Sequence, residues 1–267
     1  MARIRTINDF KTAREEKRPI SMVTCYDFAY ARLIEQTEID TILVGDSLGN
    51  VVAGYSTTVP VTLDQMIYHA EIVRRGAPSM FVIADLPFMS YHVSVGDTMR
   101  NCGRIMKETG ANAVKLEGGR DFAKTVESIT KASIPVVGHL GLTPQSVHKL
   151  GGFSVQGREE DKRRIMIEDA KMLEDAGAFC LVLEMVPEAL AREITESLSI
   201  PTIGIGAGRF TSGQVLVIND LLGMDERFKP KFLKKYANLA DTVKTALTSY
   251  HDDVVGGRFP AEEHTFK

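Results

Sequence analysis

Short apolar runs rich in valine and isoleucine recur along the chain, and they constrain its fold more than any other feature. Eight such runs occur, at residues 20–25, 41–44, 80–84, 111–116, 134–137, 179–183, 201–205 and 214–218. Most are continuous rather than alternating in polarity, as is typical of parallel strands that are buried on both faces. Stretches of helical length lie between them, and several of these end at a glycine, as at Gly76, Gly110 and Gly177.

This alternation predicts a (β/α)8 barrel, with a doubly wound open sheet as the alternative. A polar-faced helix over 5–17 precedes the barrel, with Thr6 or Asn8 as its N-cap. The other predicted helices are 27–38, 62–75, 95–109, 121–131, 160–176, 187–197 and 229–250. Because there is no linker, low-complexity segment or repeat, we predict a single domain over residues 1–267.

Composition and charge exclude several classes of function. Net charge is −3 with no basic block, so neither nucleic acid nor an anionic membrane is an expected partner. The chain contains no run of about 18 or more apolar residues, so no membrane-spanning segment is predicted. The three cysteines, Cys25, Cys102 and Cys180, form no close pair, which argues against a disulfide framework or a thiolate zinc site. We therefore expect small buried thiols, a reducing compartment and a cytoplasmic location.

Ionisable and polar residues gather where the predicted strands end. Successive strand residues point to opposite faces, so Lys115 and Glu117 share one face of their strand. The other strand ends carry Tyr26, Asp27, Asp46, Ser47, Asp85, His139 and Glu184. The beginnings of the strands carry mostly isoleucine, proline, alanine and threonine. Because the C-terminal ends of barrel strands form the active site, these polar side chains are expected to meet at one mouth.

Four carboxylates are expected at this mouth, from Asp46, Asp85, Glu117 and Glu184. Carboxylates that lie close together repel one another unless some are protonated or a cation lies among them. Oxygen ligands without a cysteine or paired-histidine pattern favour a hard ion such as Mg²⁺. A metal that uses two or three of the carboxylates leaves at least one as a general base.

The remaining candidates allow more than one role. Lys115 can neutralise a developing oxyanion or hold a substrate carboxylate, or it can simply pair with Glu117; a Schiff base is a further possibility. His139 can act as an acid, a base or a substrate donor, or can order its loop. Ser47 is interpreted as a donor to a ligand and not as a nucleophile. The glycine-rich loop at 204–208 either holds an anionic group or makes a tight turn.

Assembled in order, these stretches resemble the ketopantoate hydroxymethyltransferase family. Single stretches are short, but the ordered set over roughly residues 1–225 is highly specific. The matching stretches are VTCYD (23–27), VGDSLG (44–49), DLPFM (85–89), VKLEGG (114–119), GHLGLTPQS (138–146), LEMVP (183–187) and GIGAG (204–208).

The resemblance implies a Mg²⁺-dependent barrel that transfers a hydroxymethyl group from 5,10-methylenetetrahydrofolate to 3-methyl-2-oxobutanoate, giving 2-dehydropantoate. It also implies metal ligation by Asp46, Asp85 and Glu117, and a general base at Glu184. The residues implied for the substrate site are Asp46, Ser47, Asp85, Lys115 and His139. The family forms large homo-oligomers, commonly decamers, so a homodecamer is the implied assembly.

Two other functions remain open from the sequence. One is a related metal-dependent 2-oxo acid barrel of the isocitrate lyase or phosphonomutase type, although the chain lacks a Lys-Lys-Cys-Gly-His-like segment. The other is a catalytically silent barrel that binds a metabolite or a protein. The complete set of carboxylates and Lys115 argues against a silent barrel, because binding alone needs no free base.

Overall fold

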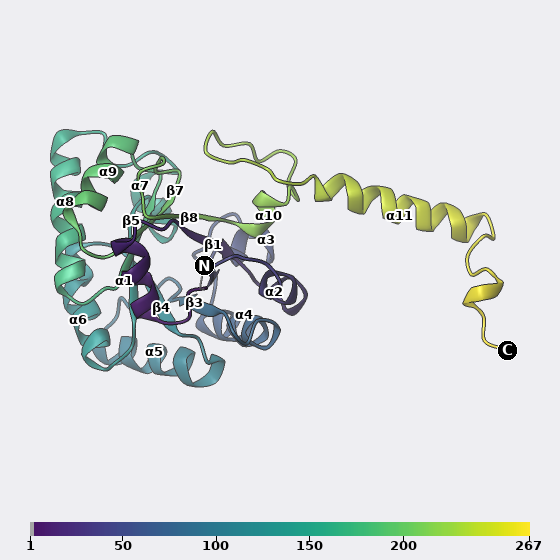
Figure 1. Ribbon diagram of the computed structural model, residues 1–267, viewed down its shortest axis with the longest axis horizontal. Coiled ribbons are helices and arrows are strands. Elements are labelled where there is room, and N and C mark those ends of the chain that lie inside the picture. The colour runs from purple at the N-terminus through teal and green to yellow at the C-terminus, as the bar shows by residue number, and fades with distance from the viewer. Residues whose placement is uncertain (1–2) are drawn as a thin grey trace. The chain divides into compact units, whose positions relative to one another are not determined.

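The computed structural model describes residues 3–267 (Figure 1). The chain divides into two compact units, Met1–Val217 and Ile218–Lys267. The single domain expected over residues 1–267 stays a prediction, and the two units are described separately.

The first unit contains a closed barrel of parallel strands. Its strands are paired in chain order, and β8 pairs with β1, which confirms the barrel and excludes the open sheet. The strands are β1 (Ile20–Thr24), β2 (Thr41–Val44), β3 (Phe81–Asp85), β4 (Ala113–Glu117), β5 (Val136–Gly141), β6 (Cys180–Glu184), β7 (Thr202–Ile205) and β8 (Gly213–Leu216). Each strand overlaps one of the predicted apolar runs.

Helices lie between most of the strands, as the periodicity predicts. In this unit they are α1 (Ile7–Glu15), α2 (Phe28–Glu35), α3 (Leu48–Val51), α4 (Leu63–Gly76), α5 (Val95–Thr109), α6 (Ala123–Lys131), α7 (Val147–Leu150), α8 (Glu160–Asp175) and α9 (Glu188–Ser197). Thr6 is the N-cap of α1, and Gly110 ends α5 in the left-handed conformation at φ +69°. The one-turn helices α3 and α7 were not predicted, because four residues are too few to show a periodicity.

The interior of the barrel changes from apolar to polar along its axis. At the N-terminal end, α1 closes the barrel, and the ring of Phe10 packs edge-to-face on Phe81 and Phe179, with centroids 5.2 and 5.1 Å away. Inward-facing residues then continue along the strands, for example Ile83 and Val182, in one apolar core. Because side chains alternate along a strand, the next inward positions fall on the ionisable residues at the opposite end.

The strand register brings ionisable residues of neighbouring strands side by side. Asp85 of β3 is aligned with Lys115 of β4, and Glu117 of β4 with His139 of β5. Gly141 at the end of β5 is aligned with Glu184 of β6. Gly141 has φ +98°, and a Cβ atom there would lie 2.1 Å from the backbone oxygen of Glu184. The two strands therefore approach each other here more closely than a side chain allows.

The connection from β7 to β8 differs from the others. It spans residues 206–212, all within the described part of the chain, and contains no helix. Gly206 and Gly208 adopt φ values of +64° and +79°, and a Cβ atom on Gly208 would collide with the side chain of Glu188. These features support the tight-turn interpretation of the glycine-rich loop.

The second unit contains α10 (Ile218–Leu221) and α11 (Leu239–Val255). The helix predicted over 229–250 is wrong in its first part, because α11 begins at Leu239. The backbone N–H groups of Tyr236 and Leu239 donate to the carbonyls of Leu221 and Leu222 instead of forming helical hydrogen bonds. The segment before α11 is thus folded back onto α10.

Two expectations from composition can be compared with the described residues. Cys25, Cys102 and Cys180 are all buried and unpaired, as expected. No helix within residues 3–267 combines the length and apolar character needed to cross a membrane.

Candidate active site

The C-terminal mouth of the barrel brings the predicted site residues together. Asp85, Glu117 and Glu184 are the last residues of β3, β4 and β6, and Asp46 follows β2 by two positions. The five residues Asp46, Asp85, Lys115, Glu117 and His139 are almost fully buried. Glu184 differs, because 20% of its side chain is exposed. The site thus combines a buried charged cluster with one carboxylate that solvent and substrate can reach.

Lys115 forms an ion pair with Asp85 across neighbouring strands. Its Nζ lies 2.6 Å from Asp85 Oδ1 and 3.4 Å from His139 Nδ1. The other carboxylate oxygen of Asp85 accepts a hydrogen bond of 3.0 Å from the backbone N–H of Asp46. The ion pair is therefore with Asp85, and pairing with Glu117 alone, one of the alternatives left open, is not what the structure shows.

His139 lies between two carboxylates. Its Nδ1 is 3.4 Å from Glu117 Oε1, and its Nε2 is 3.3 Å from Glu184 Oε2. Neither His139 Nε2 nor Glu117 Oε1 makes a hydrogen bond of good geometry within the described residues. Burial and the charge of Lys115 oppose protonation of His139, but Glu117 and Glu184 outweigh them and raise its pKa to about 9. His139 therefore links the buried cluster to the exposed carboxylate.

The cluster holds more negative charge than its one lysine balances. Burial, together with the charges of Glu117 and Asp85, raises the pKa of Asp46 to about 8. Burial also raises the pKa of Asp85, in spite of the adjacent ammonium group. Burial disfavours the charged form of Lys115, but the carboxylates of Asp85, Glu117 and Asp46 outweigh this effect and raise the pKa of Lys115. A cation near these oxygens would relieve the repulsion.

The donor set fits a hard divalent cation bound with water and substrate. Within residues 3–267, no three His, Cys, Asp or Glu side chains form a ready-made metal cage. Mg²⁺ does not need one, because it commonly binds to one or two carboxylates and keeps several waters. Glu117 Oε1 is buried without a hydrogen bond among the described residues, whereas Asp85 Oδ1 is held in the ion pair with Lys115 at 2.6 Å. Glu117 Oε1 is thus available as a ligand.

Ser47 lies at the edge of this cluster, at the N-terminus of α3. Its hydroxyl is 2.8 Å from the hydroxyl of Tyr26. Both residues come from predicted strand ends, so this part of the mouth is also formed by sequence-predicted residues. The hydroxyl is consistent with the predicted role of Ser47 as a hydrogen-bond donor to a ligand.

Sequence reasoning missed Gln145, which holds two of the carboxylates, those of Asp46 and Glu117, in place. Its side-chain amide donates to Asp46 Oδ2 at 2.9 Å and to the carbonyl of Leu86 at 3.0 Å. Its backbone N–H donates to Glu117 Oε2 at 3.1 Å, and its side-chain oxygen accepts from the hydroxyl of Tyr91 at 2.8 Å. Two signals in the sequence could have found it: Gln145 follows the strand that carries His139, and it lies within the GHLGLTPQS stretch (138–146).

We expect Tyr91→Phe to lower the free energy of unfolding by about 1–3 kcal/mol, because two buried polar groups lose their partner. These groups are the side-chain oxygen of Gln145 and the backbone N–H of Glu117, which donates to the Tyr91 hydroxyl at 3.3 Å. Urea unfolding measures the change. Tyr68→Phe is the matched control, since Tyr68 is 60% exposed on α4. Equal unfolding midpoints for the two variants would contradict this account.

Comparisons with known proteins address the family and the fold. The family model described as ketopantoate hydroxymethyltransferase matches residues 4–262. A 3-methyl-2-oxobutanoate hydroxymethyltransferase of Pseudothermotoga lettingae is 56% identical over 261 residues, which is 98% of each chain. One of Syntrophomonas wolfei is 52% identical over 266 residues, covering 100% of this chain and 96% of the relative.

Two solved structures with similar folds are much more distant in sequence than these relatives. A phosphonopyruvate hydrolase in complex with oxalate and Mg²⁺ has a TM-score of 0.63 at 11% identity, over 97% of this chain and 93% of its own. A 2,3-dimethylmalate lyase of the PEP mutase/isocitrate lyase superfamily has a TM-score of 0.61 at 15% identity. The match covers 98% of this chain and 92% of the lyase chain. At such identities the likeness concerns the fold alone.

Proposed function

The chain belongs to the ketopantoate hydroxymethyltransferase family, and we propose that it transfers a hydroxymethyl group from 5,10-methylenetetrahydrofolate to 3-methyl-2-oxobutanoate. The product is 2-dehydropantoate, an intermediate of pantothenate biosynthesis. One observation carries the proposal: a partly exposed glutamate lies beside a buried cluster of carboxylates and a lysine. That arrangement suits proton removal next to a carbonyl group whose charge must be held.

We propose that Asp46, Asp85 and Glu117 would hold Mg²⁺ either directly or through its waters, because within the described residues they form no ready-made cage. The raised pKa of Asp46 and the buried Glu117 Oε1, which makes no hydrogen bond among the described residues, support this assignment. When bound, the ion supplies positive charge that stabilises negative charge developing on the oxygens of the 2-oxo acid. Gln145 keeps two of the three carboxylates in place through its side-chain and backbone N–H groups.

The 2-oxo acid is held by Ser47, Asp85, Lys115 and His139 in this proposal. The ammonium group of Lys115 is already fixed by Asp85 at 2.6 Å, so it needs little reorganisation to face an anionic substrate. Fixed positive charge in a buried site stabilises a developing oxyanion more than it does in water. The hydroxyl of Ser47 supplies a hydrogen bond at the edge of the site.

Glu184 acts as the general base in the proposed reaction. It removes the proton from C3 of 3-methyl-2-oxobutanoate, and the electron pair of the C–H bond moves into the enolate. The enolate carbon then forms a bond to the one-carbon unit of the folate. Both C–N bonds of that unit break, and water supplies the hydroxyl group of the product. The proton taken up by Glu184 and the remaining proton of the water go to the two nitrogens of the tetrahydrofolate that is released. His139, 3.3 Å from Glu184, orients the carboxylate and accommodates its change of charge.

We also propose the homodecamer and the cytoplasmic location that the family resemblance and the unpaired cysteines support. Light scattering of the purified protein measures the assembly directly.

The function is tested by proton NMR of 3-methyl-2-oxobutanoate in D₂O with the protein, first with Mg²⁺ or EDTA and then with 5,10-methylenetetrahydrofolate. We expect the C3 proton signal to disappear only when Mg²⁺ is present, because proton removal needs the charge-balanced site. Addition of the folate should then give 2-dehydropantoate.

Other results would change the assignment in different ways. Exchange without transfer would support the proton-abstracting site but would contradict the folate as the one-carbon donor. If neither proton exchange nor transfer occurred with folded protein and bound metal, the proposed substrate would be contradicted. Turnover of another 2-oxo acid would then favour a lyase or mutase, and binding without turnover a silent barrel.

A further inference from the structure

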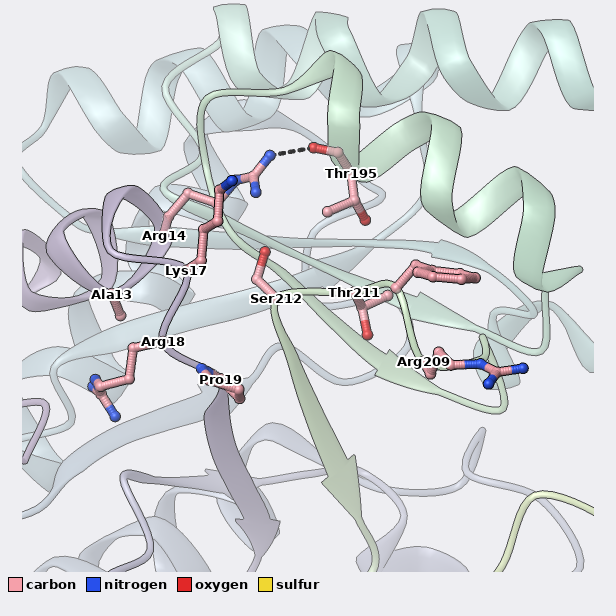
Figure 2. Close-up of a pocket in the computed structure, with 10 residues that line it drawn as sticks. Ala13, Arg14, Lys17, Arg18, Pro19, Thr195, Arg209, Thr211 and Ser212 are labelled. Atoms are coloured by element: carbon pink, nitrogen blue, oxygen red, sulfur yellow. Dashed lines mark hydrogen bonds between the residues drawn. The ribbon is translucent and has the colours of Figure 1, made fainter.

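A cavity of about 260 Å³ lies on the first unit, away from the carboxylate cluster. Figure 2 shows it between the end of α1 and the connection from β7 to β8. The backbone carbonyl of Ser212, which lines the cavity, accepts from Ile20 at the start of β1, and its hydroxyl accepts from the N–H of Thr202 at the start of β7. The cavity is therefore at the N-terminal end of the barrel, whereas the predicted site is at the other end.

The lining of the cavity is strongly positive. Four of its residues are cations, Arg14, Lys17, Arg18 and Arg209, and none is a carboxylate. Such a concentration of one charge in a concave site raises the local concentration of anions.

Two of these charges are balanced by carboxylates and two are not. Arg18 pairs with Asp40 at 2.8 Å, and Arg209 pairs with Glu188 at 2.9 Å. Neither Arg14 nor Lys17 has an ion-pair partner within the described residues. About two positive charges are thus available for a ligand.

The donors around the cavity are partly fixed in place. One terminal nitrogen of Arg14 donates to the carbonyls of Thr195 and Leu198, at 2.5 and 3.2 Å. The first of these hydrogen bonds is drawn in Figure 2. The guanidinium group is therefore anchored, and its other nitrogens make no hydrogen bond to any residue from 3 to 267, so they can donate to a ligand. The hydroxyl of Ser212 accepts a hydrogen bond from Thr202, which leaves its own hydrogen for a ligand.

We propose that this cavity binds a phosphate group, as free phosphate or as part of a small phosphate monoester. A phosphate group carries about two negative charges at neutral pH and offers several acceptor oxygens, which match the two unbalanced cations and the Ser212 hydroxyl. Guanidinium groups suit phosphate because their planar donors fit two oxygens at once. The site is independent of the reaction at the opposite end of the barrel.

The test is a ³¹P NMR titration of the full chain with inorganic phosphate and with glycerol 3-phosphate at constant ionic strength. We expect saturable binding, weakened about tenfold or more in Lys17→Gln by the loss of one charged hydrogen bond. Lys11→Gln is the matched control: it removes the same charge from α1, outside the cavity, and should bind as the unsubstituted chain does. Tighter binding of glycerol 3-phosphate would identify a monoester as the ligand, and equal binding free phosphate.

A second variant separates charge from folding. Lys17 follows α1 at φ +54°, a conformation that glycine adopts readily, so Lys17→Gly removes the cation without adding backbone strain. We expect the same weakening of phosphate binding in this variant. Equal affinities in the Lys17 and Lys11 variants, or no saturable binding, would overturn the proposal. Displacement of phosphate by 3-methyl-2-oxobutanoate would also overturn it, because that ligand is assigned to the opposite end.

Discussion

Glu184→Gln is expected to abolish exchange of the C3 proton of 3-methyl-2-oxobutanoate and to lower turnover by about 10²–10⁴-fold. The amide keeps the shape of the side chain but cannot accept the proton. Binding of the 2-oxo acid in the presence of Mg²⁺ should persist, since Glu184 lies outside the set proposed to hold the ion. The variant thus separates proton removal from binding.

Deuterium exchange followed by NMR and calorimetric binding of the 2-oxo acid measure the two effects independently. Glu196→Gln is the control: it removes a carboxylate from α9 that pairs with Arg192 on the surface. It should leave both exchange and binding unchanged. If exchange continued at the original rate in Glu184→Gln, another group would have to be the base.

Lys115→Met is expected to lower the free energy of unfolding by about 3–5 kcal/mol and to abolish turnover, because it leaves buried carboxylates without their cation. The ammonium group lies 2.6 Å from Asp85 and balances a cluster that also contains Asp46 and Glu117. Methionine fills much of the same volume, so loss of charge rather than a cavity dominates the effect.

Chemical denaturation in buffer with EDTA measures this change without a contribution from bound metal. Lys131→Met is the control, since Lys131 pairs with Glu127 on the exposed side of α6. Exposed ion pairs contribute about 0–1 kcal/mol, so this variant should unfold near the original midpoint. Similar losses in both variants would show that the buried lysine does not hold the cluster together.

The positions of the ionisable residues could be predicted from the sequence because strand ends are local features. The alternation in β4 correctly placed Lys115 and Glu117 on one face, and the recurrence of strands placed Asp46, Asp85 and Glu184 at the same mouth. The fold followed from the same recurrence. The pairing of residues across neighbouring strands was harder to predict from the sequence.

Lys115 illustrates the missing information. Neighbouring strands lie about 4.8 Å apart, whereas residues two positions apart on one strand are separated by about 6.6 Å. Lys115 therefore meets Asp85, its aligned neighbour on β3, more closely than Glu117 on its own strand. The register that aligns them depends on the closure of the whole barrel.

Gln145 and Tyr91 illustrate a second limit. Tyr91 lies in a loop and Gln145 in the short 3-10 helix Pro144–Ser146, and their hydrogen bond joins residues 54 positions apart in the sequence. The position of Tyr91 after Asp85 predicts that it lines or closes the mouth, with loop packing as the alternative. No periodicity marks its hydrogen bond to Gln145, because that contact depends on how two connecting segments meet above the strands. Similarly, the start of α11 was misplaced because the preceding segment exchanges helical hydrogen bonds for contacts with α10.

The close approach of β5 and β6 has a consequence for how this protein can evolve. At Gly141, any side chain would collide with the backbone of Glu184, and φ +98° disfavours every residue except glycine. A mutation there would displace the strand end that carries the proposed base, even though Gly141 itself offers no functional group. Substitutions of Gly141 are therefore not expected to be tolerated as long as the function requires Glu184 in its present position.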